Sequence, residues 1–283
     1  MKASFQYLLK TSRTRFWMYV FGPALLGLFI SLLAQDSISL QLNQILALAY
    51  FTIPANLLIY GINDIFDGDT DQYNPKKSTY ENQHSKSQTK FLSTAIALTN
   101  LPFLLYFAVI SNIQSLLCLV AFLFFSIQYS ATPIRAKAKP FIDGIFNFLY
   151  VAPALFMISL QNPEILSKGS IPIILAGTFW CMAMHCFSAI PDIEADQKAD
   201  LNTTAVLLGQ NGAFIYCFFL YLATACIATA SSFFIGLPLF VYPLLIIYTY
   251  KNQQKTFQIY KYFPYLNTLV GFIIAMQLMY KLI

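Results

Sequence analysis

Charged residues are scarce in this sequence of 283 amino acids: they make up 10% of it, whereas hydrophobic residues make up 58%. An ordinary soluble domain is about one-quarter charged, so a soluble chain of this length would lack the polar residues needed to cover its surface. Charge is absent altogether from long stretches such as 101–126 and 214–247. This scarcity excludes a soluble protein and predicts one that is embedded in lipid.

Cysteine is sparse too, and its five positions lack the spacing of a metal or disulfide site. All five lie inside apolar segments without CxxC spacing, which favours small packing residues. A basic stripe with interleaved aromatic residues is also lacking, although the net charge is +5, and this argues against nucleic acid as a partner. The first apolar run lacks a small-x-small cleavage site and exceeds the ~7–15 residues of a signal-peptide core, so we interpret it as a retained helix.

Nine apolar stretches approach the length of about 20 residues that a helix needs to cross a bilayer. We predict spans at 16–34, 42–62, 91–110, 113–130, 141–160, 170–190, 210–230, 233–250 and 263–282. The predicted fold class is therefore all-α: a polytopic membrane protein with nine transmembrane helices, in which residues 1–283 form a single domain.

Lysine and arginine are distributed unevenly between the predicted loops. The N-terminus and the loops after the even-numbered spans hold 15 of the 17 basic residues, and the opposite side keeps only Lys168 and Lys281. Cytoplasmic loops of membrane proteins are enriched in basic residues. We therefore expect a multi-pass protein of the bacterial inner membrane, with its N-terminus and its even-numbered loops in the cytoplasm.

Acidic residues gather in two clusters at the cytoplasmic ends of predicted spans. The clusters consist of Asp64, Asp67, Asp69 and Asp71, and of Asp192, Glu194, Asp196 and Asp200. If the chain continues as a helix, Asn63, Asp67 and Asp71 share one face at i, i+4 and i+8, and Asp192, Asp196 and Asp200 do the same. Two such ladders of negative charge indicate that a cation binds between them.

Mg²⁺ suits these ladders because it takes one or two carboxylates from each element and completes its shell with water and substrate phosphates. We predict Mg²⁺ as the cofactor and a diphosphate as the substrate group held between the ladders. An EF-hand calcium loop is excluded because Gln72 and Ser78 stand where that loop needs Gly and Glu. Solvated loops, in which the acids only balance nearby lysines, remain the alternative.

Basic residues follow the fourth predicted span at Arg135, Lys137 and Lys139. Arg135 and Lys137 are our candidates for binding the diphosphate oxygens that the metal leaves free. Anchoring of the loop at the cytoplasmic face explains any single one of these cations equally well.

At these residues the chain resembles the UbiA superfamily of intramembrane prenyltransferases. The first motif of that family, NDxxDxxxD, is matched by Asn63, Asp64, Asp67 and Asp71, and the second, DxxxD, by Asp192 and Asp196. The resemblance covers essentially the whole chain. It implies a bundle of nine helices around a central cavity capped by the motif-bearing loops, with these six residues as the metal site. It also implies Mg²⁺-dependent transfer of a prenyl group from an allylic prenyl diphosphate to an apolar acceptor, with Asp67 and Asp192 as catalytic residues.

Segments 12–17, 129–133 and 187–192 are similar to the lycopene elongases, the carotenoid branch of this family. The similarity implies that a five-carbon donor, with dimethylallyl diphosphate as the candidate, alkylates the end of a long polyene. Two alternatives stay open: a UbiA-type enzyme acting on an aromatic or quinone precursor, and a cation or metabolite transporter. A transporter usually has polar groups near the membrane midplane, whereas both acidic clusters are predicted at one face.

Prenyl transfer creates a carbocation, which aromatic rings stabilise without attacking it. The rings expected near the motif-bearing ends are those of Tyr60, Phe66, Tyr129, Tyr150 and Phe187. Among them we take Tyr129 as a candidate substrate-binding residue.

Asp143 and Asn147 open the fifth predicted span, one helical turn apart. A charged residue near membrane depth is a functional candidate, and Asp143 is our candidate for the catalytic group that takes the proton lost after alkylation. Asn147 is a candidate for binding substrate. A local ion pair with the preceding lysines is the alternative for Asp143, and His185 is interpreted as a packed histidine.

Overall fold

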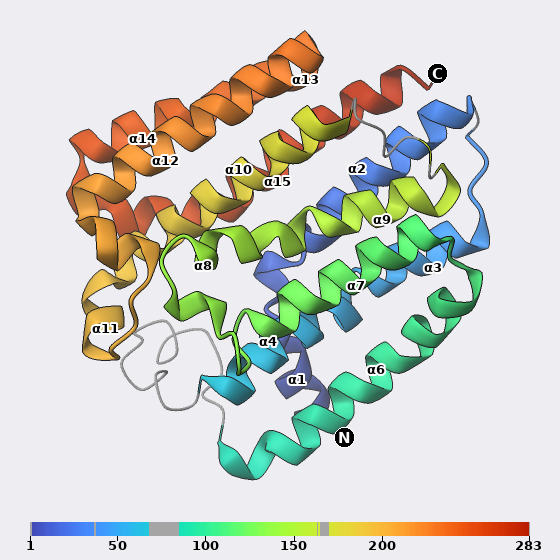
Figure 1. Ribbon diagram of the computed structural model, residues 1–283, viewed down its shortest axis with the longest axis horizontal. Helices are drawn as coiled ribbons and strands as arrows, with labels where there is room; N and C mark the ends of the chain where they lie inside the picture. Colours follow the sequence, from blue (N-terminus) through green and yellow to red (C-terminus); the bar gives the residue numbers. More distant parts are fainter. Residues whose placement is uncertain (1, 37, 68–84, 163, 165–169, 283) are drawn as a thin grey trace.

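The computed structural model describes residues 2–36, 38–67, 85–162, 164 and 170–282. Within these ranges the chain forms helices and turns, and no strand is present (Figure 1). The α-helices are α1 (Lys2–Thr11), α2 (Met18–Gln35), α3 (Leu42–Tyr50), α4 (Ile53–Phe66), α6 (Thr89–Ile110), α7 (Ile113–Gln128), α8 (Ile142–Ile145), α9 (Ala152–Gln161), α10 (Ile171–Ala189), α11 (Ile193–Lys198), α12 (Thr204–Ser231), α13 (Phe233–Gly236), α14 (Val241–Lys251) and α15 (Thr256–Tyr280).

Seven helical segments of the described chain are long and apolar enough to cross a membrane, and one bent pair raises the number to eight. The bent pair joins Ile142–Tyr150 to Ala152–Gln161 at an angle of 41° and corresponds to the fifth predicted span. The fourth predicted span is the 16-residue helix α7, shorter than the about 20 residues that a span requires. The all-α, multi-pass fold is confirmed, but the number of nine spans is not.

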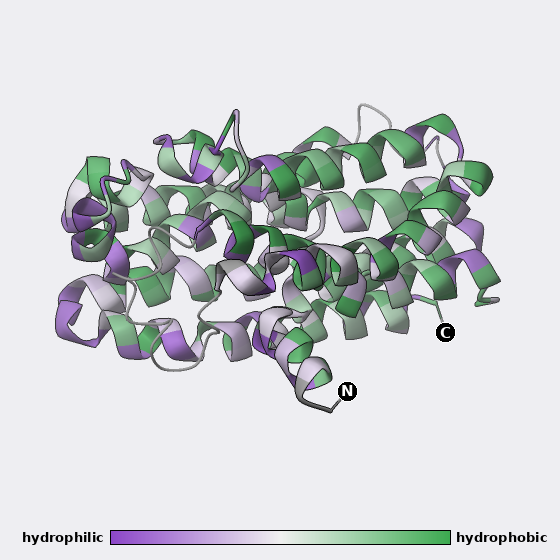
Figure 2. Ribbon diagram, turned by 90° about the horizontal axis from the view of Figure 1, so that it is seen from below, coloured by the Kyte–Doolittle hydropathy of each residue, from purple (hydrophilic) through white to green (hydrophobic). Residues whose placement is uncertain are grey.

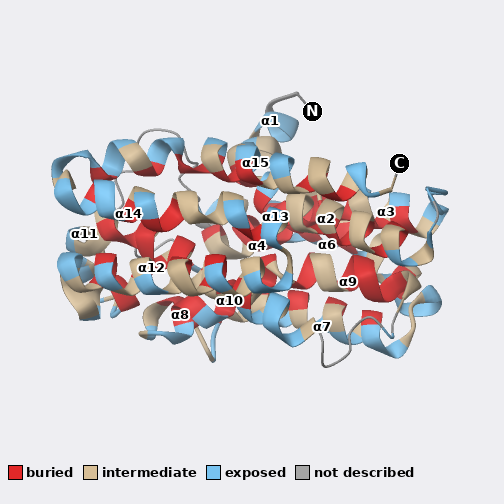
Figure 3. Cartoon of the chain, turned by 90° about the horizontal axis from the view of Figure 1, so that it is seen from above, coloured by how far each residue is buried: buried red, intermediate tan, exposed pale blue. Residues whose placement is uncertain are grey.

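The outer faces of the helices are apolar. On α6, Leu98, Leu105 and Val109 are 70%, 66% and 85% exposed. Figure 2 shows mostly hydrophobic residues along the helices, and Figure 3 shows the buried residues between them. Water would penalise so much exposed apolar surface, whereas lipid chains match it, so this surface is that of an integral membrane protein.

Close packing holds the bundle together. Helix α10 packs along α12, and α2 packs along α9. A side chain at Gly27 of α2 would collide with the backbone of Ala154 in α9, so the absence of a side chain permits this approach. Small residues serve membrane helices in this way because lipid offers little hydrophobic drive for helix association.

The segments that carry the two acidic clusters lie at the same end of the bundle. Figure 1 shows the last turn of α4 and the short helix α11 at this end, with the C-terminus of the chain at the other. The N-terminal helix α1 packs against α4. Sequence positions that are far apart are thereby brought to one face, as the two-ladder hypothesis requires.

The ladders themselves are shorter than predicted. Helix α4 ends at Phe66, and Asp67 is its C-terminal cap with φ −104° and ψ 4°. Gly68 follows in the sequence, a residue type that commonly terminates helices. The second ladder ends as well, because α11 stops at Lys198 and Asp200 adopts φ 55°. The predicted i+8 rung is therefore lost from the second helix, and Asp71 lies outside the described residues.

Candidate active site

A cavity of about 250 Å³ lies between the segments that carry the two acidic clusters. Most of its charged lining comes from four parts of the chain: the N-terminal segment, the end of α4, the loop after α7, and the second cluster. The charged and amide residues at this lining include Arg13, Asn63, Asp67, Lys137, Asp192 and Asp196. Carboxylates from both motifs therefore face one shared space.

Asn63 and Asp67 are bonded to each other across one turn of α4. The Asn63 Nδ2 donates a hydrogen bond of 2.6 Å to Asp67 Oδ2 and another of 3.0 Å to Ser130 Oγ. Asp67 is only 5% exposed, and its other carboxylate oxygen forms an ion pair with the ammonium group of Lys137. A buried charge needs such partners, and this arrangement fixes the first motif against the loop after α7.

The loop after α7 is folded so that Lys137 returns to the site. The Lys137 amide donates a hydrogen bond of 3.0 Å to the carbonyl of Tyr129, which joins the two ends of the loop. Both Tyr129 and Lys137 line the cavity. Lys139 is exposed, and Arg135 is half-buried and is not among the described residues that line the cavity. The geometry thus separates Lys137 from its two neighbouring cations.

Arg13 is a site residue that the motifs did not indicate. Its Nη2 donates hydrogen bonds of 3.1 Å to both Asn63 Oδ1 and Asp64 Oδ1, and its guanidinium lies 4.7 Å from the centre of the Tyr60 ring. The side chain of Asp64 is 2% exposed, so Arg13 neutralises a buried carboxylate while lining the cavity. The only sequence signal was the position of Arg13 in segment 12–17.

We expect Arg13→Gln to lower the stability of the protein by about 3 kcal/mol, because the buried carboxylate of Asp64 would lose the positive charge that faces it. This value is the low end of the range for breaking a buried ion pair, and we choose it because the Arg13 side chain is 15% exposed. The double variant Arg13→Gln/Asp64→Asn should recover much of this loss, since no buried negative charge remains at that position. Thermal unfolding in detergent measures both effects, and additive losses would contradict the pairing.

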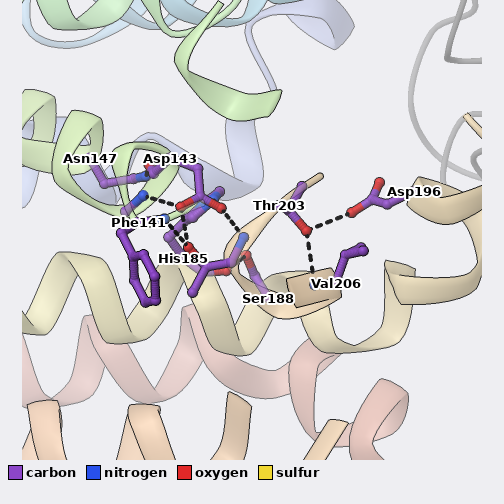
Figure 4. Close-up of polar contacts among 10 residues, drawn as sticks. Phe141, Asp143, Asn147, His185, Ser188, Asp196, Thr203 and Val206 are labelled. Carbon is purple, nitrogen blue, oxygen red and sulfur yellow. Dashed lines mark hydrogen bonds and ion pairs between the residues drawn. The ribbon is translucent and has the colours of Figure 1, made fainter. Parts of the chain in front are cut away.

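The second motif presents two carboxylates to the cavity. Asp192 lies at the start of α11 and Asp196 one turn later, and both line the cavity. The hydroxyl of Thr203 lies 3.5 Å from Asp196 Oδ2, which positions it as a donor to that carboxylate (Figure 4). In the described part of the chain, no three His, Cys, Asp or Glu side chains gather closely enough to form a metal-binding group by themselves.

Aromatic rings form a large part of the cavity wall. Phe16 stacks on Tyr19 with 5.5 Å between ring centres, and the hydroxyls of Tyr60 and Tyr150 lie 3.3 Å apart. All four rings line the cavity. Such rings offer π-electron density but few nucleophilic atoms, so this part of the site can hold a cation away from water.

Two of the rings expected in the lining lie elsewhere. Phe66 is 39% exposed at the end of α4. Phe187 is fully buried and packs on Phe263 with 5.0 Å between ring centres. Neither is among the described residues that line the cavity, whereas Tyr60, Tyr129 and Tyr150 are.

Asp143 is buried behind the cavity wall. It is 0% exposed and accepts hydrogen bonds from the amide of Thr204 at 2.7 Å and from the Thr204 hydroxyl (Figure 4). His185 Nε2 lies 3.5 Å from Asp143 Oδ2. His185 and Asn147 line the cavity, while Asp143 is not among the described lining residues. The residue that sequence analysis interpreted as packing thus faces the site.

An apolar helical bundle with an aromatic cavity, and with carboxylates and cations at one end of that cavity, defines a membrane-embedded enzyme for a substrate with an anionic head and an apolar tail. The model of the UbiA prenyltransferase family matches residues 20–261. The chain belongs to this family, and it is a prenyltransferase.

Similar proteins agree with this assignment along the whole chain. The lycopene elongase/hydratase of Haloarcula japonica is 36% identical over 271 residues, which cover 95% of this chain and 90% of that protein. The lycopene elongase/hydratase of Halobacterium salinarum is 34% identical over 275 residues, which cover 96% of each. Among solved structures, a UbiA homolog from Archaeoglobus fulgidus bound to DMAPP and Mg²⁺ has a TM-score of 0.68 at 21% identity, covers 97% of each chain, and shows the same fold.

Proposed function

We propose that this protein transfers the prenyl group of an allylic diphosphate, with dimethylallyl diphosphate as the candidate donor, to the end of a lycopene-type polyene. The observation that carries the proposal is the convergence of Asp67, Asp192 and Asp196 on one cavity with an aromatic wall. The names of the two similar proteins support lycopene as acceptor, and the solved homolog with DMAPP and Mg²⁺ supports the donor and the metal.

The residues at the cavity fit Mg²⁺. Asn63, Asp67, Asp192 and Asp196 supply hard oxygen atoms from two segments, the donors that Mg²⁺ prefers. Bound Mg²⁺ would stabilise the negative charge that develops on the leaving diphosphate. Asp64 and Asp71 remain predicted metal ligands. In the described structure, Asp64 forms an ion pair with Arg13.

Two cationic side chains of the protein are placed to bind the diphosphate as well. Lys137 and Arg13 line the cavity beside the acidic residues, and we assign both to binding the diphosphate oxygens. Arg135 remains a predicted diphosphate ligand. Tyr129 and Asn147 line the same cavity as the aromatic rings, and we assign both to binding the prenyl group.

We also propose that the protein is oriented with the acidic end of the cavity toward the cytoplasm. The loop after α7 and the N-terminal segment lie at this end and are rich in Lys and Arg, and positive residues are retained on the cytoplasmic side. Labelling of single-cysteine variants at exposed Lys139 and at Tyr280 in intact cells tests this, because only the second should react with an impermeant reagent.

Purified protein supplied with labelled dimethylallyl diphosphate, Mg²⁺ and lycopene should release diphosphate and form a labelled, extended polyene. Removal of Mg²⁺ with EDTA should stop both reactions, since the acidic residues would then repel the diphosphate. An aromatic quinone precursor in place of lycopene serves as the rival acceptor. Exclusive labelling of that precursor would overturn the polyene acceptor, and absence of diphosphate release with every donor and acceptor would overturn the prenyl transfer itself.

A further inference from the structure

Alkylation of an alkene leaves a second positive charge that the site must remove. When the prenyl carbon bonds to the acceptor, the π pair of the acceptor forms the new C–C bond and the neighbouring carbon becomes a cation. A neutral product requires the loss of one proton, either from an adjacent carbon or from a water molecule that has added. A base inside the cavity is therefore needed, and this requirement rests on the proposed function.

We propose that His185, oriented by Asp143, is the base that receives this proton. His185 lies on α10 and lines the cavity together with Met184 and Ser188 of the same helix and with Asp192 of the short turn Ile190–Asp192 that follows it. Seven residues separate His185 from Asp192, which corresponds to roughly 10 Å along a helix. The imidazole is therefore set back along α10 from Asp192, which we assign to the diphosphate end, and lies on the side where the tail of the donor would meet an apolar acceptor.

We assign the proton to His185 instead of Asp143, because the Asp143 carboxylate is 0% exposed and is already engaged by hydrogen bonds. Besides the two hydrogen bonds from Thr204, it accepts one of 2.7 Å from the amide of Gly144, and its own carbonyl accepts one of 2.7 Å from Asn147 Nδ2. These contacts tie α8 to the start of α12 and hold the carboxylate 3.5 Å from His185 Nε2 (Figure 4). Asp143 is thus a positioning residue for the imidazole.

The pairing also selects the tautomer of the histidine. A carboxylate beside Nε2 favours the hydrogen on Nε2, which leaves Nδ1 as the basic nitrogen. Tyr129 also contacts the ring, and it meets the imidazole edge-on with 5.8 Å between ring centres. A phenol is a much weaker base than an imidazole near neutral pH, so among these neighbours His185 is the group suited to accept a proton.

The step balances with these groups alone. The C–H electron pair of the acceptor cation becomes the new double bond, and the proton passes to His185 Nδ1. If water is captured instead, an oxygen lone pair forms the C–O bond and the water proton passes to the same nitrogen. The imidazolium that results is stabilised by the adjacent Asp143 carboxylate, and the proton returns to water when the products leave.

The test is His185→Gln in the full-length protein with Mg²⁺, labelled dimethylallyl diphosphate and lycopene. Ionisation of the donor does not use the base, so diphosphate release should stay within about threefold of the wild type. The amount of extended polyene per diphosphate released should fall at least about tenfold, a conservative value because a general base contributes about 10²–10⁴-fold. The missing product should be replaced by free prenyl alcohol, because an acceptor cation that cannot lose its proton reverts to acceptor and prenyl cation. Water then traps the prenyl cation, and the proton of that water passes to the released diphosphate.

Asp143→Asn tests the same proposal through the amount of extended polyene formed per diphosphate released. An amide next to Nε2 can offer its NH₂ group and favour the wrong tautomer, so the product ratio should fall as in His185→Gln, whereas Asp143→Glu should restore part of it. Thr224→Val is the matched structural control. It removes a buried hydrogen bond of 3.1 Å to Ala176 between the same helices α12 and α10, so it should lower stability and leave the product ratio unchanged.

The outcomes separate this inference from the proposed function. A wild-type product ratio in His185→Gln, or a loss of diphosphate release equal to the loss of product, would overturn the role of His185 as the base. An inactive wild-type protein would overturn the proposed function instead. If His185→Gln failed to fold, Asp143→Asn and Asp143→Glu would decide, because a purely structural Asp143 would leave the product ratio unchanged in both.

Discussion

Asp192→Asn is expected to reduce Mg²⁺-dependent release of diphosphate by about 10³-fold or more. The carboxylate lines the same cavity as Asp67, and the amide that replaces it has the same shape but no charge. Ionisation of an allylic diphosphate depends on stabilising negative charge as it develops, and removal of one stabilising group from such a site costs about 10²–10³-fold. The effect of removing a metal ligand should lie at or above the upper end of this range, because its loss also weakens the binding of the ion that provides most of the stabilisation.

The matched control is Glu194→Gln, two residues away on the same short helix. Glu194 is exposed and is not among the described residues that line the cavity, so the same change of charge there should leave diphosphate release within about twofold of the wild type, as for surface charges in general. Asp67→Asn should behave like Asp192→Asn, and each should require a higher Mg²⁺ concentration. Full turnover in either variant would remove these residues from the catalytic site.

Much of the fold was predictable because lipid imposes simple rules on a sequence. Apolar stretches of the required length predicted most helices, and the basic residues together with the two acidic clusters predicted that both motifs lie at one end. The ends of helices were harder to predict. The sequence did not indicate that α4 ends at Phe66 or that the fifth span bends by 41°, since a helix ends or bends through local capping and packing that hydrophobic length does not encode.

The site was predictable only where a residue carries its own pattern. Asp67, Asp192 and Asp196 stand in spaced acidic motifs, so their convergence could be inferred. Arg13 and His185 stand alone in the sequence, and their roles arise from partners on other helices. A single arginine or histidine has no periodicity to analyse. What each one faces follows only from the contact of the segment after α1 with α4 and from the packing of α8 on α10.

Lys137→Met is expected to lower kcat/KM for the prenyl diphosphate by about 10²-fold, mainly through a higher KM. Lys137 is 8% exposed and paired with Asp67, so its ammonium group is held in a poorly hydrated site where a charge-assisted bond to a phosphate is strong. Methionine keeps much of the apolar stem and removes only the charge. Lys139→Met makes the same change two residues away at an exposed position and should have little effect.

The dependence on Mg²⁺ distinguishes Lys137 from the acidic residues. The Lys137 ammonium forms an ion pair with one oxygen of Asp67, and it therefore competes with a divalent ion for that carboxylate. Lys137→Met should bind Mg²⁺ alone as tightly as the wild type or more tightly, while Asp67→Asn should bind it more weakly. Titration of the metal into both variants, in detergent and without diphosphate, measures this difference. Weaker Mg²⁺ binding in Lys137→Met would mean that the lysine shapes the metal site, so that its effect on turnover would not come from contact with the diphosphate.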